Sequence, residues 1–530
     1  MECIPNIGMV YTTRSMALLL LAFPGRVLTI ISPSILPVRP FVFSRADRRV
    51  QSGFMTHTQL FIKGAWTDSL TGSTLEVLNP ATAEAIGTVS HAKHSDLDLA
   101  LEAAELGFHA WRKIPAFERS KIMRRAAELL RSRLDAVART LTTEQGKPLA
   151  EAKTEILIAA DVVDWFAEES RRTYDRVIPP RAEGVYQLVV KEPVGPVAAF
   201  SPWNFPINQA VRKISIALAC GCSIILKGPE ETPGPCAALV SAFADAGVVP
   251  GAMNLVFGVP ADISEYLIPH PVIRKISFTG STAVGKRLAA LAGLHMKRTT
   301  MELGGHAPVI IFEDADLDVA TKVMAASKYR NAGQVCISPT RFLIQKKVYD
   351  SFVDKFITAS NNVKVGDGLE SGTTMGPLAH ERRLEAMEGF VSDAVDKGAK
   401  IQTGGDRIGG KGYFFPPTIL TDASRNSRVM NDEPFGPVSV MVPFSEFDEA
   451  VAEANRLPYG LAAYAWTKSA KTANRIGAAV ESGMVSINHL GLALPEVPFG
   501  GVKDSGYGSE GGSEAMDAYL NSKFISQAGL

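Results

Sequence analysis

The chain has 530 residues, of which 46% are hydrophobic and 21% charged. This composition is typical of a globular protein, with room for about three or four domains. The 55 Lys and Arg balance the 55 Asp and Glu, and a net charge of zero argues against a nucleic-acid binder, which presents a basic surface. Five cysteines without regular spacing favour a reducing compartment, and no His and Cys residues have metal-ligand spacing.

Residues 1–54 differ from the remainder of the sequence, with six Arg, no Lys and two acidic residues. The apolar run at 16–23 is too short to span a bilayer, which needs about 20 residues. An Arg-rich, acid-poor segment fits a transit peptide, which would place the protein in the mitochondrial matrix. We favour the alternative that translation starts at Met55, so that residues 1–54 are an extension outside the fold and the protein is cytoplasmic.

The next part of the chain contains short elements followed by long helices. Strand-like runs alternate with turns over 60–88, and helical periodicity follows at 96–111 and 116–133. Further helices extend to about residue 174, with a break at the Gln-Gly-Lys-Pro turn at 145–148. An extended amphipathic segment occupies 187–194.

Residues 197–303 alternate strands with helices four times. The predicted strands are 197–200, 223–226, 253–257 and 273–278, and the predicted helices are 207–219, 235–246, 261–268 and 283–293. This alternation predicts an α/β domain with a doubly wound parallel sheet. A second α/β unit follows Gly305 and continues to about residue 488.

Two short motifs carry a carboxylate and a thiol that are candidates for catalysis. Met-Glu-Leu-Gly-Gly-His at 301–306 contains Glu302, and Gly-Gln-Val-Cys-Ile-Ser at 333–338 contains Cys336. A cysteine reacts as its thiolate, with a free pKa of about 8.5, so a site must help it ionise. A carboxylate beside it can act as a base on the thiol or on water. Considered separately, Glu302 could cap a strand and Cys336 could be a small core residue.

Five motifs together resemble the NAD(P)-dependent aldehyde dehydrogenase superfamily. Besides the two above, they are PWNFP at 202–206, FTGST at 278–282 and EPFGP at 433–437. They have that family's order and spacing, and the resemblance covers about residue 59 to the C-terminus.

The resemblance implies three structural parts. They are an NAD-binding domain over 55–180 and 198–304, a catalytic domain over 305–500, and a small β oligomerisation arm over 181–197 and 501–530. Within the arm, 187–194 and 520–527 would pair in an intersubunit sheet of a homodimer or homotetramer.

The resemblance also implies a mechanism. Cys336 would attack the aldehyde carbon, with the oxyanion held by the Asn204 side-chain amide and the Cys336 N–H. Hydride would leave for nicotinamide C4, giving a thioester that water activated by Glu302 would hydrolyse. Outside its motif, Asn204 would be interpreted as a turn residue.

Three groups of residues are implied to bind the cofactor. The first is the strand–helix turn with Gly280, Ser281 and Gly285, where a helix N-terminus can hold a phosphate, although such residues also serve as simple caps. The second is Lys227 with Glu230 at the end of a strand, which would bind the adenosine ribose.

The third group comprises Trp203, Glu433 and Phe435, which would surround the nicotinamide and its ribose. Because the Glu230 carboxylate would repel a 2′-phosphate, NAD is favoured over NADP.

The substrate implied by the resemblance is a short carboxylated semialdehyde. Arg212 and Arg330 occupy positions that bind the carboxylate of succinic semialdehyde, although each could instead make a structural ion pair. The loop 489–495 lacks a Ser that some such enzymes use, and residue 338 is Ser rather than Cys. We therefore expect oxidation of succinic semialdehyde to succinate, with 2-oxoglutarate semialdehyde as the alternative substrate. A cofactor-independent thiol hydrolase and a catalytically silent binding protein are the alternatives from other classes.

Overall fold

A computed structural model of the chain describes residues 56–529, and the predictions for residues 1–54 lie outside that range. Within it, no helix has both the length and the apolar character needed to cross a membrane.

Among the described residues, eight strands form a first sheet in the order β22-β12-β11-β8-β9-β10-β2-β3. Its outer strands are β22 (Gly506–Tyr507), β2 (Leu60–Ile62) and β3 (Ala65–Thr67). Its parallel centre consists of β8 (Val197–Phe200), β9 (Ile224–Lys227), β10 (Met253–Val256), β11 (Lys275–Thr279) and β12 (Arg298–Glu302). The intervening helices are α5 (Pro206–Cys220), α6 (Pro233–Ala246), α7 (Pro260–Leu267) and α8 (Thr282–Leu294). This sheet confirms the predicted doubly wound α/β fold.

The winding direction reverses between β8 and β11. From β8 the chain adds β9 and β10 on one side, then returns to add β11 and β12 on the other. Ligands of open parallel sheets bind at the carboxyl ends of the strands beside such a reversal. The loops after β8 and β11 therefore mark this edge as the place to look for a site.

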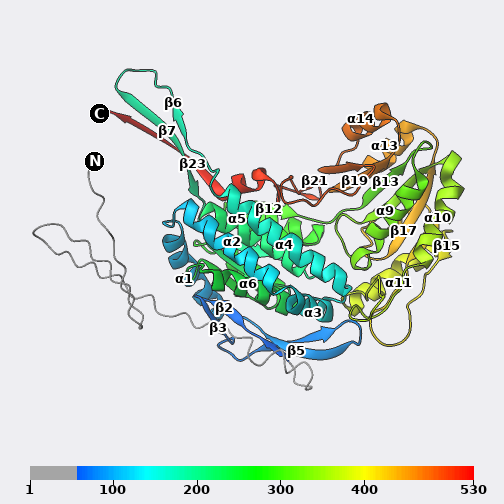
Figure 1. Cartoon of the computed structure of the whole chain (residues 1–530), viewed down its shortest axis with the longest axis horizontal. Helices are drawn as coiled ribbons and strands as arrows, with labels where there is room; N and C mark the ends of the chain where they lie inside the picture. The colour runs from blue at the N-terminus through cyan, green and yellow to red at the C-terminus, as the bar shows by residue number, and fades with distance from the viewer. Residues whose placement is uncertain (1–55, 530) are drawn as a thin grey trace, which may run out of the picture. The chain divides into compact units, whose positions relative to one another are not determined.

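A layer of long helices comes before the central strands of this sheet in the sequence. It contains α1 (His94–Trp111), α2 (Ala116–Ser132), α3 (Leu134–Gln145) and α4 (Leu149–Glu169). Gly146 ends α3 in the left-handed conformation, with φ of 99°, and Pro148 precedes α4, so the predicted break falls between two helices. Figure 1 shows α4 beside both α2 and α5, and these helices share the apolar core of the first sheet.

In the same described range, seven strands form a second sheet. Their order is β15 (Lys400–Thr403), β16 (Thr418–Thr421), β17 (Val438–Phe444), β14 (Pro339–Gln345), β13 (Ala307–Ile311), β19 (Ala462–Trp466) and β20 (Met484–Ile487). Val309 and Ile311 face a core with α9 (Leu317–Tyr329) and α10 (Tyr349–Asn361), whereas Ile310 faces α13 (Phe447–Asn455) and α14 (Ala470–Ala479). Alternate strand residues thus enter separate cores on the two faces.

A third, small sheet joins β6 (Arg176–Ile178), β7 (Val185–Pro193) and β23 (Leu520–Ala528) in antiparallel pairs (Figure 1). The two segments predicted to pair in an intersubunit sheet therefore pair within one chain, where β7 lies beside β23.

The assignment of residues 501–519 to the arm is wrong. Within this segment, β22 (Gly506–Tyr507) pairs with β12, and β21 (Val502–Lys503) pairs with β18 (Tyr459–Gly460). The backbone at residue 506 can approach β12 closely because this residue is glycine. A Cβ at Gly506 would overlap the Met301 carbonyl. Further along, the side chains of Ala515, Met516 and Tyr519 complete the core of the first sheet.

Candidate active site

Four loops meet at the carboxyl edge of the first sheet. The loop after β8 carries Trp203 and Asn204, β9 ends at Lys227, the turn after β11 carries Ser281, and β12 ends at Glu302. Because β12, β11, β8 and β9 are parallel neighbours, all four ends lie at the same edge of the sheet, two on each side of the switch point. Cys336 reaches this edge from the second unit of the fold, because β12 leads directly into β13 and Gly305 lies against the Cys336 carbonyl.

The loop that carries Cys336 begins with an unusual backbone. Asn331, Ala332 and Gly333 follow α9 with φ of 50°, 52° and 72°, all in the left-handed region. For the two residues with a side chain this conformation costs roughly 1–2 kcal/mol each, so the surroundings must hold it. Close approach explains the glycine, because a Cβ at Gly333 would overlap the Gly436 carbonyl. The thiol that follows is half-buried between fully buried neighbours.

The Cys336 thiol is held in its neutral form. Burial raises its pKa to about 12, and the charges of Glu433 and Glu302 act in the same direction, whereas Arg330 opposes them. At neutral pH this thiol is therefore protonated, and it would have to lose a proton before it could react.

Glu302 is a buried carboxyl without a hydrogen-bond partner on either oxygen among the described residues. Burial raises the pKa of Glu302 well above its usual range, and the charge of Glu510 adds to the rise, whereas Lys213 and Arg212 oppose it. Little space remains on one side, since a Cβ at Gly500 would lie 3.2 Å from Glu302 Oε1. A carboxylate with a raised pKa is a stronger base, which suits it to accept a proton.

A buried ion pair lies near Glu302 and was not predicted from the sequence. Lys213 on α5 forms a salt bridge with Glu510, and neither side chain is exposed. Lys213 Nζ also donates to Thr279 Oγ1 at 2.7 Å, and Ser277 Oγ donates to Glu510 Oε1 at 2.7 Å. The opposite charges of Lys213 and Glu510 offset each other beside the Glu302 carboxyl. No sequence motif connects residues 213 and 510.

Asn204 is buried, with its amide directed toward the thiol loop. Its Nδ2 donates to the Gln334 carbonyl at 3.0 Å, two residues before Cys336. An amide NH₂ has two donors, so one N–H remains for a substrate oxygen. The structure thus places a neutral donor against the loop that carries Cys336.

The predicted phosphate turn forms the N-terminus of α8. Ser281 is the exposed N-cap and makes no side-chain capping bond, so the first N–H groups of the helix have no cap from it. Gly285 permits close packing, because a Cβ there would overlap the Leu303 side chain, and Gly280 N donates to the Glu302 carbonyl at 3.0 Å. Free N–H groups at the N-terminus of a helix are suited to bind an anion.

The predicted ribose-binding pair is joined in the structure. Buried Lys227 forms a salt bridge with the partly exposed Glu230 at the end of β9. The Lys227 charge therefore offsets part of the Glu230 charge, which weakens the repulsion expected for a 2′-phosphate. These donors and acceptors, with the α8 end, match the polar groups of a dinucleotide, and no cluster of three metal-ligating side chains occurs among residues 56–529.

Glu433 lies against the Gly-Gly pair of the Glu302 motif. Its Oε1 accepts from Gly305 N at 3.0 Å, and a Cβ at Gly304 would lie 2.5 Å from its Oε2. Burial raises the pKa of Glu433 to about 7. Nearby, Phe435 has a left-handed φ of 49° and meets the Trp203 ring edge-on at 5.6 Å.

The two candidate arginines differ in their partners. Arg212 is buried and donates to the carbonyls of Glu510 at 2.7 Å and Ala493 at 3.3 Å, with its guanidinium 5.0 Å from the Phe499 ring. Arg330 stacks 5.3 Å from the Phe205 ring, and its buried Nε has no hydrogen-bond partner in the described part of the chain. The charges of both reach Cys336. Among the described residues, Arg330 therefore has fewer hydrogen-bond partners than Arg212.

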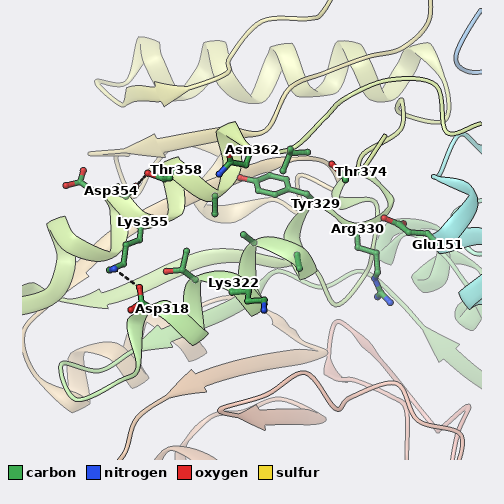
Figure 2. A pocket seen from close by; sticks show the side chains of 15 residues that line it. Glu151, Asp318, Lys322, Tyr329, Arg330, Asp354, Lys355, Thr358, Asn362 and Thr374 are labelled. Carbon is green, nitrogen blue, oxygen red and sulfur yellow. Dashed lines mark hydrogen bonds and ion pairs between the residues drawn. The ribbon is translucent and has the colours of Figure 1, made fainter. Parts of the chain in front are cut away.

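Arg330 also lines a cavity of about 760 Å³ between α9 and α10. Figure 2 shows Arg330 and Glu151 at one end of the cavity, with Asp318, Asp354 and Lys355 at the other. Its guanidinium points away from the α10 side chains. Arg330 thus connects this cavity with the loop that carries the thiol.

Comparison with known proteins places this geometry in a family. Residues 66–525 match the model of the aldehyde dehydrogenase family. The chain is 46% identical to 4-(hydroxymethyl)benzenesulfonate dehydrogenase TsaD1 of Comamonas testosteroni, over 88% of this chain and 97% of the relative. It is 41% identical to the NADP⁺ succinate-semialdehyde dehydrogenase GabD of Escherichia coli, over 88% and 97%. The crystal structure of succinate-semialdehyde dehydrogenase from Burkholderia pseudomallei superposes with a TM-score of 0.87 at 43% identity, over 89% of this chain and 98% of that one. The chain therefore belongs to the aldehyde dehydrogenase family of NAD(P)-dependent, aldehyde-oxidising enzymes.

Proposed function

We propose that this enzyme oxidises a short semialdehyde with an anionic far end, succinic semialdehyde in the first place, with NAD as the acceptor. The observation that carries the proposal is the presence of Arg330 beside Cys336, with a buried nitrogen that has no partner among the described residues. An unpaired buried donor is costly, and a substrate carboxylate would satisfy it.

In the proposed reaction the half-buried Cys336 releases its proton to solvent, and the thiolate bonds to the aldehyde carbon. The remaining Asn204 N–H and the Cys336 backbone N–H stabilise the oxyanion. NAD, when bound, would supply the hydride acceptor, and loss of hydride from the Cys336 adduct would leave a thioester on Cys336. Glu302 then takes a proton from water, the resulting hydroxide attacks the thioester carbonyl, and the acid product departs with the thiol regenerated.

A substrate panel tests the proposal. NADH formation is measured with succinic semialdehyde, 2-oxoglutarate semialdehyde, glutaraldehyde and propanal. We expect the highest kcat/KM for an acid-bearing aldehyde. A preference for 2-oxoglutarate semialdehyde would select the alternative acid, and a preference for propanal would remove the anion requirement. Turnover without any nucleotide would instead support a thiol hydrolase.

Replacing Arg330 with leucine should lower the kcat/KM for succinic semialdehyde about 10- to 150-fold, the value of one charge-assisted hydrogen bond of about 1.5–3 kcal/mol. Propanal makes no such contact and should be affected far less. The ratio of the two kcat/KM values is the quantity to measure.

Arg212→Leu tests the second proposed contact to the carboxylate and should lower the same ratio. It should also lower the melting temperature, because it leaves the Glu510 and Ala493 carbonyls without their donor. Arg330→Lys should restore only part of the ratio, since lysine lacks the planar fork. Equal losses for both substrates in Arg330→Leu would exclude a role in binding the carboxylate.

Replacing Glu230 with serine should raise the KM for NAD and lower that for NADP, because both the ribose acceptor and a negative charge are lost. Glu230→Gln is the control, since it keeps an acceptor and removes only the charge. Initial rates with each nucleotide check the prediction. If wild-type enzyme uses both nucleotides equally, the salt bridge from Lys227 explains the loss of discrimination. Unchanged KM values in Glu230→Ser would remove Glu230 from the cofactor site.

We also propose a homodimer or homotetramer that uses the arm. Phe524 and Ile525 are adjacent in β23, so their side chains point to opposite faces, and both are exposed. A partner subunit covering the arm would bury at least one of them. For the cellular location we propose the cytoplasm, which agrees with free thiols at all four cysteines in the described part of the chain.

A further inference from the structure

We propose that Lys147 is a positioning residue of the reaction, which fixes the backbone of Asn204 and thereby aims the Asn204 amide at the oxyanion. The inference rests on the proposed role of Asn204. Lys147 lies in the short turn between α3 and α4, outside all the motifs that suggested the function.

Lys147 is fully buried and directs its ammonium group at the loop after β8. Its Nζ donates to the Asn204 carbonyl at 2.8 Å and to Glu155 Oε2 at 2.6 Å. The same Nζ lies 3.8 Å from the centre of the Phe205 ring. One cation therefore contacts both the oxyanion-stabilising residue and its successor.

Glu155 on α4 connects Lys147 to the N-terminus of α5. Its Oε1 accepts from the backbone N–H groups of Ile207 at 3.0 Å and Asn208 at 3.2 Å, which are free donors of the first helical turn. The Lys147–Glu155 pair thus holds the chain on both sides of Phe205. Rotation of the Asn204 peptide would break the Lys147 bond, so the side-chain direction of Asn204 is fixed with it.

The loop that carries Cys336 is bonded both to the Asn204 carbonyl and to α4. Asn331 Nδ2 is the second donor to the Asn204 carbonyl, at 2.9 Å, and Asn331 N donates to Glu151 Oε2 at 2.8 Å. Glu151 and Glu155 are one turn apart on α4, so this helix sets the position of the oxyanion donor and of the left-handed segment before Cys336 together. A displacement of about 1 Å in such a pair can cost about 100-fold in rate.

Stability alone gives no reason for an ionic pair at this place. Replacing a buried ion pair by apolar residues of similar volume is often neutral or stabilising. What an apolar pair cannot supply is the donor to the Asn204 carbonyl.

The test is a double-mutant cycle between Lys147→Met and Asn204→Ala, measured as kcat/KM for the aldehyde at saturating NAD. Lys147→Met should lower this value about 10- to 100-fold in the wild-type background, with the Kd for NAD unchanged. In the Asn204→Ala background it should cost less than about threefold, because the group that it positions is absent. If Lys147→Met does not fold, Lys147→Met combined with Glu155→Gln removes both charges and is carried through the same cycle.

Arg119→Met is the matched control. Arg119, on α2, is also a buried cation that donates to two carbonyls, those of Ile114 at 2.7 Å and Ala219 at 3.1 Å, but its contact with α5 is at the C-terminal end of that helix. It should lower the melting temperature without changing kcat/KM.

Equal losses from Lys147→Met in both backgrounds, or a change in the Arg119 variant as large as in Lys147→Met, would overturn the inference. A loss under about tenfold in Asn204→Ala itself would instead remove the oxyanion role of Asn204, and the two failures are distinguishable.

Discussion

Cys336→Ala should lose aldehyde oxidation by roughly 10⁴- to 10⁶-fold, the scale of removing a covalent nucleophile. No other described thiol can replace it. Cys220, Cys222 and Cys236 are buried, and their thiols lie against the carbonyls of Met516, Tyr519 and Pro206, whereas Cys336 is half-buried. Cys336 belongs to the second unit of the fold, and its thiol is not among the groups proposed to bind the cofactor, so NAD binding should persist.

Both properties can be measured on one preparation, with NADH formation for turnover and nucleotide titration for binding. Cys222→Ala is the control, because its thiol lies 3.5 Å from the Tyr519 carbonyl, away from the switch point, and its loss should leave turnover intact. Retention of more than a few per cent of wild-type activity in Cys336→Ala would be incompatible with a thioester mechanism.

Glu302→Gln should separate the two halves of the reaction. An amide cannot accept the proton of water, so the thioester should form and then hydrolyse roughly 10²- to 10⁴-fold more slowly, the usual contribution of a general base. A rapid burst of NADH followed by a slow steady state is the expected trace in stopped-flow absorbance.

The pH dependence adds a second criterion. Because the pKa of Glu302 is raised, the carboxylate fraction at a given pH is smaller than for an exposed glutamate and increases as the pH rises through that pKa. The steady-state rate of the wild type should therefore increase with pH over this range, and that of Glu302→Gln should lose this dependence. Loss of the burst itself would show that Glu302 acts on the thiol before acylation rather than on water.

The sequence predicted the central architecture because its signals are local. Three of the four helices of the doubly wound sheet begin at a proline, and two of these three end at a glycine. Pro206, Pro233 and Pro260 start helices, while Gly221 and Gly247 end them in the left-handed conformation. The strands between them are short apolar runs. These features are visible within windows of a few residues.

The sequence could not predict contacts between distant segments. Lys213 and Lys147 are ordinary charged residues until the fold shows Glu510 beside one and the Asn204 carbonyl beside the other. The boundary of the arm was wrong for the same reason, since only tertiary structure shows that Gly506 lies on β12. The left-handed conformation of Asn331 and Ala332 is likewise imposed by partners on α4 and in the thiol loop.

The pairing of Lys213 with Glu510 joins residues 297 positions apart and constrains the order of folding. While the chain is being synthesised, most of the first sheet can assemble, but Lys213 has no carboxylate partner until the last part of the chain has left the ribosome. The strand β23 reaches β7 even later. Contacts of such sequence separation form slowly and leave incomplete intermediates exposed to aggregation. The first sheet is therefore translated early but completed late. C-terminal truncations should yield insoluble protein even when they spare the whole loop that carries Cys336.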